Sequence, residues 1–295
     1  MQVFNGISLS SILLLAAIGL AITFGLMGVI NMAHGEFMMI GAYTAYMVQN
    51  LFEDALPGIF GAYVPVAIVL SFVVAAAFGW VLERLVICRL YGRTEDSLLV
   101  TWGISLILQQ VARNIFGAPN VGVGVPSFME GSLQIGSVYL PYTRILILLI
   151  ALLSLLVVYL LMYRSRWGRN IRAVMQNRPM ASCLGVNTRQ VDGMTFAFGC
   201  GLAGLAGCTL TWIGLIGPTL GQNYIVNAFM TVVVGGAGSI FGSIFGAGFI
   251  GIGQSALEFL TDASMGQVLI FLCIVILLQF KPKGLFETKN RSLED

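Results

Sequence analysis

Eight long apolar stretches, separated by short polar segments, constrain the fold of this chain more than any other feature. They lie at about residues 8–30, 36–51, 62–83, 97–116, 142–162, 191–216, 223–254 and 266–280. Several reach the roughly 20 residues that an α-helix needs to cross the hydrocarbon core of a bilayer. Only 9% of the residues are charged, against about a quarter in soluble domains. We therefore expect an all-α polytopic membrane protein of about eight transmembrane helices, forming a single transmembrane domain over residues 1–295.

The basic residues gather in a few of the polar segments. Most of the 15 Lys and Arg residues lie in segments 84–93, 164–189 and 281–291. Neither residue type is present in segments 53–61, 117–141 and 255–265. Because membrane proteins keep their basic loops in the cytoplasm, the first set, including the C-terminus, is expected inside and the second set outside. The side of the N-terminus stays open, since residues 8–51 could cross twice or make one broken crossing.

Other patterns limit the possible functions. The first ten residues, MQVFNGISLS, lack a basic region and a cleavage site, so we expect them to lead into the first membrane helix. Five Cys residues without CxxC spacing argue against disulfides and metal sites. The net charge of +2 is too small to indicate nucleic-acid binding. Because the chain lacks GxxxxGK followed by Ser or Thr, and His34 lies near no recognisable nucleophile motif, we expect no ATP site, no cofactor and no enzyme activity.

Residues 31–37, NMAHGEF, place polar side chains inside the apolar run from Leu9 to Val48. One helix over residues 8–51 would be about 66 Å long, roughly twice the hydrocarbon core. The helix must therefore be interrupted, and we expect Asn31 to stop and cap it, with Gly35 where the backbone turns. His34 and Glu36 are functional candidates, because ionisable residues inside a membrane are costly. The alternatives are a cytoplasmic turn with both side chains in water and, less favoured, a metal site.

A second interruption is predicted in VVVGGAGSIFGSIFGAGFIGIGQ, residues 232–254. If 255–265 is outside, the run 223–254 must enter the membrane, turn and return. The expected turn residues are Gly235, Gly236 and Gly238, with Ser239 capping the next helix. Small residues then recur at every fourth position, which is typical of close helix packing, and packing alone is the alternative reading. Interrupted segments at comparable places in two halves indicate a transport pathway, so we expect the two breaks to face each other.

The longest cytoplasmic segment is the predicted basic loop, residues 164–190. Residues 169–175 are expected to form a short helix. Asn177 is expected to cap a second helix over Pro179–Leu184, which Gly185 ends. Met180 and Leu184 lie on one face of that helix and offer an apolar ridge to a partner protein. The alternative is a basic loop that binds lipid headgroups.

Three stretches, GVINMAHGEFMMIGAY, RAVMQNRPMASCLGVNTRQV and VVVGGAGSIFGSIFGA, resemble in this order the motifs of inner-membrane permeases of the branched-chain amino acid class of ABC importers. TWGISLILQQVARNIFGAPNVGV and KPKGLFETKNRS look more like the urea-transport permease of that class. The resemblance implies a subunit of the bacterial inner membrane that pairs with a second homologous permease. It also implies two cytoplasmic ATP-binding subunits and a periplasmic substrate-binding protein.

The resemblance further implies that residues 176–185 form the helix that couples the permease to the ATPase. The coupling residues would then be Asn177, Arg178, Pro179, Met180, Ala181, Leu184 and Gly185.

The resemblance makes urea the expected substrate, and a neutral solute also suits a path lined by uncharged polar groups. The polar candidates are Asn31, Thr101, Gln109, Gln110, Asn223 and Asn227. They join His34, Gly35, Glu36, Gly235, Gly236, Gly238 and Ser239 of the two breaks. Any single polar residue could instead form a helix–helix hydrogen bond. The alternatives are a branched-chain amino acid importer, in which helix termini and Glu36 would bind a zwitterion, and a stand-alone channel or proton-coupled carrier with His34 and Glu36 as a relay.

Overall fold

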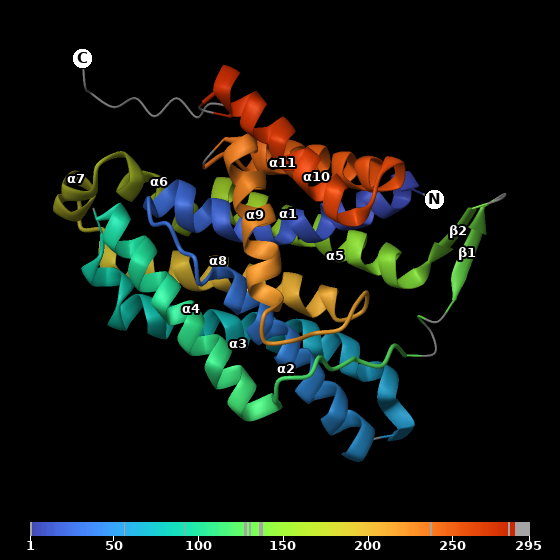
Figure 1. Cartoon of the computed structure of the whole chain (residues 1–295). Coiled ribbons are helices and arrows are strands. Elements are labelled where there is room, and N and C mark those ends of the chain that lie inside the picture. The colour runs from blue at the N-terminus through green and yellow to red at the C-terminus, as the bar shows by residue number, and fades with distance from the viewer. Residues whose placement is uncertain are drawn as a thin grey trace.

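The computed structural model describes residues 2–55, 57–91, 93–126, 129, 131–135, 138–236, 238–282 and 284–286. These residues form a bundle of α-helices with one β-hairpin (Figure 1). The elements are α1 Gln2–Met27, α2 His34–Ala55, η1 Pro57–Ala62, α3 Tyr63–Leu85, η2 Ile87–Arg89, α4 Thr94–Phe116, β1 Ser132–Ile135, β2 Val138–Pro141, α5 Tyr142–Arg164, α6 Arg166–Gln176, α7 Arg178–Cys183, α8 Thr188–Leu210, α9 Leu220–Gly235, α10 Ile240–Leu260 and α11 Ala263–Phe280.

The long helices run between two ends of the bundle (Figure 1). We call the end that carries α6 and α7 the basic end, and the end that carries the antiparallel pair β1–β2 the hairpin end. Helix α1 runs from the hairpin end to the basic end, and α2 runs back (Figure 1). Residues 8–51 therefore run in both directions along the bundle. Leu285 and Phe286, the last described residues, bond the end of α9 through their amides.

The centre of the bundle is built around α8, which packs against α1, α2 and α3. Helices α1 and α8 are the most buried of the candidate spans. Glycines let their neighbours approach at backbone distance, since a Cβ on Gly207 would lie 1.8 Å from the Met38 carbonyl oxygen. Small residues at helix contacts allow this approach in membranes. The core is therefore held by close helix packing as well as by large apolar side chains.

The small residues of α10 also lie at helix contacts. A Cβ on Gly242 would lie 2.1 Å from the Gly235 carbonyl oxygen of α9, and one on Gly251 would lie 2.3 Å from Ser10 Oγ of α1. Helix packing thus accounts for the four-residue spacing of small residues in α10. The outer faces of α5 and α11 instead expose large apolar side chains, as the lipid-facing surface of a membrane protein does.

Six helical segments of the described residues are long and apolar enough to cross a membrane. They are Phe4–Gly25, Phe60–Arg89, Tyr142–Arg164, Thr188–Leu210, Ile240–Leu260 and Ala263–Phe280. Helices α2 and α4 are as long but carry more polar residues, and α9 has only 16 residues. The prediction of an all-α polytopic membrane protein is confirmed. The run 223–254 divides into α9 and α10, as its predicted break requires.

The basic loop differs from its predicted boundaries by a few residues. Helix α6 begins at Arg166 and not at 169, because the Ser165 side chain accepts a hydrogen bond from the Gly168 amide and caps it. Helix α7 spans Arg178–Cys183, one residue earlier than predicted, which lies within the uncertainty of helix ends.

Candidate functional site

The first break joins α1 to α2 through residues 28–33. Gly28 has a φ of 65°, a left-handed conformation that favours glycine, so the turn lies there and not at Gly35 as predicted. Asn31 has the expected capping role, but at the start of α2 and not at the end of α1. Its Oδ1 accepts a hydrogen bond from the Ala33 amide at 3.1 Å, and its carbonyl accepts one from the His34 amide at 3.2 Å.

Helix α2 begins halfway along α1. His34 Nε2 lies 3.2 Å from the carbonyl oxygen of Ala16, and α1 continues for about three more turns beyond Ala16. Residues 28–33 therefore return from the basic end into the middle of the bundle. His34 and Glu36 are 0% and 1% exposed. The alternative of a turn with both side chains in water is wrong.

A polar stripe on α4 lies against this break. Its members Ser97, Thr101, Ser105 and Gln109 are spaced four residues apart, so they share one helix face, and all are buried. Ser105 Oγ and Gln109 Nε2 each donate a hydrogen bond of 2.9 Å to Glu36 Oε1. Thr101 Oγ1 accepts one from the Met32 amide at 3.1 Å. The predicted pathway residues Thr101 and Gln109 are thus brought to Asn31 and Glu36.

The N-termini of α2 and α9 meet at the same place. A Cβ on Gly35 would lie 2.3 Å from the carbonyl oxygen of Gly221, and one on Gly221 would lie 2.4 Å from that of Gly35. Gly35 is therefore required for backbone contact between two helices, and not for a turn. Each helix start carries a partial positive charge from the helix dipole.

Several buried polar atoms here lack a hydrogen-bond partner within the described part of the chain. They are Asn31 Nδ2, His34 Nδ1, Glu36 Oε2 and Asn227 Oδ1. Buried polar groups are nearly always paired, so unpaired ones indicate a place for water or a ligand. One amide donor, one carboxylate acceptor and two helix N-termini make a site that can bind a small polar or zwitterionic solute.

Two of the predicted polar candidates lie elsewhere. Gln110 is exposed and its Nε2 donates to Asn114 Oδ1 at 3.2 Å, because it points away from the buried stripe of α4. Asn223 is exposed on the outer face of α9, whereas Asn227 is buried on the inner face.

Sequence reasoning missed Ser105, although its four-residue spacing from Thr101 and Gln109 could have indicated it.

The second break has the predicted local structure. Helix α9 ends at Gly235, and Gly236 and Gly238 have φ values of 99° and 85°. Ser239 Oγ accepts a hydrogen bond from the Gly242 amide at 3.0 Å and caps α10. The amides of Leu285 and Phe286 donate to the carbonyls of Val234 and Gly235, an arrangement that the sequence did not reveal.

The two breaks come together only at the basic end, where the first break begins at Gly28. The second break lies at the basic end, since a Cβ on Gly238 would be 3.2 Å from the Gly25 carbonyl oxygen. Helix α9 separates it from Gly221 by about 21 Å, at 1.5 Å per residue. The start of α9 meets the first turn of α2, whereas the segment after its end meets the last turn of α1. Gly235, Gly236, Gly238 and Ser239 therefore lie apart from the polar atoms around Glu36.

The predicted coupling helix is α7. Asn177 Oδ1 accepts a hydrogen bond from the Met180 amide at 2.9 Å, and Gly185 ends the segment with a φ of 83°. Both predicted local roles are confirmed. The side chains of Met180 and Leu184 are 58% and 78% exposed, whereas Ala181 is buried. Pro179 lies in the first turn of α7. A backbone N–H at that position has no partner within the helix, so proline, which lacks one, loses no hydrogen bond there.

Arg178 faces the permease and not the open surface of α7. One of its guanidinium nitrogens lies 2.6 Å from Asp192 Oδ2 of α8, and the group stacks 4.7 Å from the ring centre of Tyr91. Tyr91 Oη donates at 3.1 Å to Glu83 of α3. Burial, with Asp192 and Glu83 nearby, raises the pKa of Tyr91, so it stays a neutral donor. Arg178 thus ties α7 to α3 and α8 and offers no free cation to a partner.

A bundle of membrane-spanning helices with buried polar and ionisable groups at its centre is the arrangement of a membrane transport protein. The chain belongs to the family described as "Branched-chain amino acid transport system / permease component", which matches residues 2–278. Members of this family are non-catalytic permease subunits, so the expectation that the chain is not an enzyme is confirmed. No solved structure gives a significant match to the chain.

Three relatives cover nearly all of this chain. The high-affinity branched-chain amino acid transport system permease protein LivH of Escherichia coli (strain K12) is 32% identical over 297 residues, which cover 96% of this chain and 94% of that protein. The corresponding protein BraD of Pseudomonas aeruginosa is 30% identical, with the same coverage. LivM of E. coli (strain K12) is 27% identical over 97% of this chain and 70% of its own length. These names support branched-chain amino acids better than urea.

Proposed function

We propose that the chain is the permease subunit of an ABC importer for branched-chain amino acids in the bacterial inner membrane. The relatives named for branched-chain amino acid transport, which match almost end to end, carry this proposal. Escherichia coli has two such relatives of this chain, LivH and LivM, which supports pairing with a second homologous permease. The remaining partners are two cytoplasmic ATP-binding subunits and a periplasmic substrate-binding protein. The basic end, with the C-terminus, faces the cytoplasm because it carries most Lys and Arg residues.

The proposed substrate site is the junction of α2, α4 and α9. The partial positive charges at the starts of α2 and α9 suit the carboxylate of an amino acid, because helix N-termini attract anions. Glu36 Oε2, buried and without a partner among the described residues, suits its ammonium group. Discontinuous helices bind substrates near the bilayer midplane in other transporters in this way. A carrier relay is less well supported, because His34 Nε2 is engaged with Ala16 and Glu36 Oε1 with Ser105 and Gln109.

Deleting the chain is expected to abolish high-affinity uptake of radiolabelled leucine and to leave urea uptake unchanged. The host must carry the intact partner subunits, and uptake is measured at low external concentration. Restoring the full-length gene should restore leucine uptake. A strain that loses urea uptake but keeps leucine uptake would contradict the proposed substrate, and uptake that survives ATP depletion would contradict the ABC mechanism.

Replacing Glu36 with glutamine is expected to lower leucine transport by at least about 30-fold, because losing one partner of a buried charge pair costs about 2 kcal/mol or more. The glutamine Oε1 can still accept the hydrogen bonds of Ser105 and Gln109, so the fold should persist. Leucine uptake is measured per amount of permease in the membrane. Glu53→Gln, which changes an exposed glutamate near the end of α2, is the matched control. Equal uptake by the two variants would show that Glu36 has only a structural role.

A further inference from the structure

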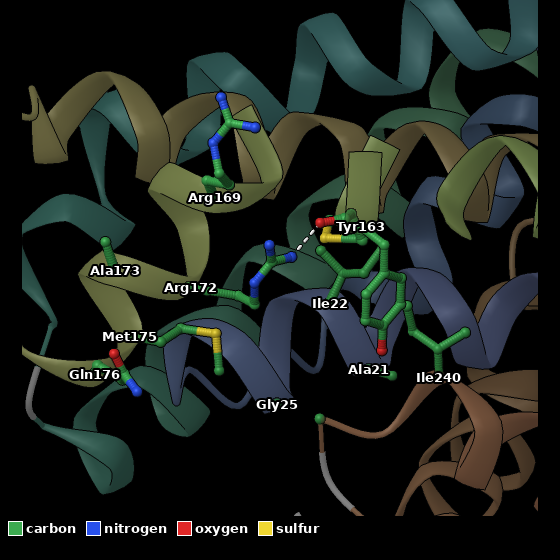
Figure 2. Close-up of a pocket in the computed structure, with 12 residues that line it drawn as sticks. Ala21, Ile22, Gly25, Tyr163, Arg169, Arg172, Ala173, Met175, Gln176 and Ile240 are labelled. Carbon is green, nitrogen blue, oxygen red and sulfur yellow. Dashed lines mark hydrogen bonds between the residues drawn. The ribbon is translucent and has the colours of Figure 1, made fainter. Parts of the chain in front are cut away.

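A cavity of about 470 Å³ opens at the basic end, between α1, α5, α6 and the start of α10 (Figure 2). One wall is apolar and is formed by Ala21, Ile22 and Gly25 of α1 together with Met162 and Ile240. The opposite wall is polar and belongs mainly to α6, which contributes Arg169, Arg172 and Gln176. The cavity thus has an apolar side against the membrane helices and a cationic side on α6.

The chain holds the cationic wall in place through the tight junction of α5 and α6. A Cβ on Gly168 would lie 2.2 Å from the carbonyl oxygen of Met162, so only glycine lets α6 begin against the last turn of α5. Arg172 Nη1 donates a hydrogen bond to that same carbonyl (Figure 2). The guanidinium also lies 5.7 Å from the ring centre of Tyr163. The Arg172 side chain is therefore held at the cavity. Its other guanidinium N–H groups remain available to a ligand.

The cavity has no negative charge of its own to balance these cations. None of the described residues that line it is acidic. Within the described chain, Arg169 and Arg172 form no ion pair, in contrast to Arg178, which bonds Asp192. A guanidinium binds phosphate oxygens with paired hydrogen bonds, and unpaired arginines beside a membrane helix are therefore suited to a phosphate group.

We propose that this cavity binds an anionic phospholipid, with its phosphate at Arg169 and Arg172 and its acyl chains against α1 and Ile240. Basic pockets between membrane helices recognise lipid headgroups through these two kinds of contact. A soluble phosphate would use the arginines but would leave the apolar wall unfilled. The lipid joins α6, which leads directly into α7, to the ends of α1 and α10 at the point where Gly25 meets Gly238.

The test uses the full chain purified in detergent, and native mass spectrometry counts bound phosphatidylglycerol and phosphatidylcholine. The wild type should retain one phosphatidylglycerol under conditions that remove phosphatidylcholine. Arg169→Gln with Arg172→Gln should weaken phosphatidylglycerol binding by roughly 30-fold, because each basic residue near an anionic headgroup contributes a factor of about five. Arg164→Gln with Arg166→Gln removes the same charge from neighbouring positions that do not line the cavity, and should retain the lipid.

Two further measurements separate lipid binding from other causes. Ala173→Leu narrows the cavity but keeps both arginines, and should also lower lipid retention while the melting temperature stays near that of the wild type. Glycerol phosphate, the headgroup chemistry without acyl chains, should compete at least about 100-fold more weakly than the lipid, because each buried methylene adds to affinity. Equal lipid loss in both arginine pairs overturns the proposal. Equal competition by glycerol phosphate assigns the cavity to a soluble anion instead.

Discussion

Replacing Gly35 with alanine is expected to reduce transport by at least tenfold. The added Cβ would lie 2.3 Å from the carbonyl oxygen of Gly221, so the backbones of α2 and α9 must separate. Backbone cannot give way as a flexible side chain does, and overpacking a close contact costs about 1–3 kcal/mol or more. The displacement would also move Glu36 from Ser105 and Gln109. Uptake per amount of membrane-inserted permease and the melting temperature in detergent measure the effect.

Gly103→Ala is the matched control for this experiment. Gly103 lies within α4, and no atom lies within 4 Å of the place where its Cβ would be. Alanine there should leave transport unchanged and stabilise the helix by about 0.5–1 kcal/mol. Gly221→Ala should reproduce the loss seen at Gly35, because it changes the other side of the same contact. Normal transport and melting temperature in Gly35→Ala would show that α2 and α9 are not in backbone contact.

Truncating Met180 and Leu184 together to alanine is expected to weaken ATPase association by at least roughly 100-fold, since buried apolar anchors carry about 2 kcal/mol or more each at an interface. Both side chains are exposed, Met180 on α7 and Leu184 at its C-cap, while the membrane helices hold their own core. The permease should therefore stay folded but lose coupled transport. Co-purification of the ATPase with the permease measures association, and substrate-stimulated hydrolysis measures coupling.

Met265→Ala with Leu215→Ala is the control, because these residues are of the same types and are 58% and 66% exposed away from α7. They should retain the ATPase. Cys183, exposed in α7, gives a direct second readout. A bound ATPase should protect it from a water-soluble maleimide in the wild type and not in the Met180 and Leu184 variant. If that variant keeps wild-type ATPase binding and protection, these side chains are not the anchors, and a lipid-binding loop would explain the segment better.

Local features of the candidate site followed from the residues themselves. Asn177 and Ser239 cap helices as predicted, because a cap depends only on a side chain and an amide two or three residues away. Gly236 and Gly238 take left-handed conformations for an equally local reason. The need for a break in residues 8–51 followed from helix length alone. Its position did not, because the turn was predicted at Gly35 and only the structure shows the left-handed conformation of Gly28.

The contacts that assemble the site join residues far apart in the chain. Glu36 accepts from Ser105 and Gln109, which lie 69 and 73 positions away, and Gly35 meets Gly221. The sequence shows the polar stripe of α4 but not the helix that it faces. Likewise, the sequence does not distinguish Arg178 from the other arginines of the loop. Only the fold shows that it forms an ion pair with Asp192. Sequence position therefore indicated which residues are unusual but not which of them come together.

The sequence alone determined that this chain is a polytopic helical membrane protein with interrupted helices and a basic loop. Those conclusions depend on hydropathy, charge and glycine content, which are properties of each segment and its solvent. The tertiary structure decided that α2 and α9 begin together in the middle of the bundle and that the second break lies at the basic end. The physical reason is that lipid is as apolar as a protein core, so hydropathy does not choose between neighbours. Close glycine contacts and a few buried hydrogen bonds make that choice.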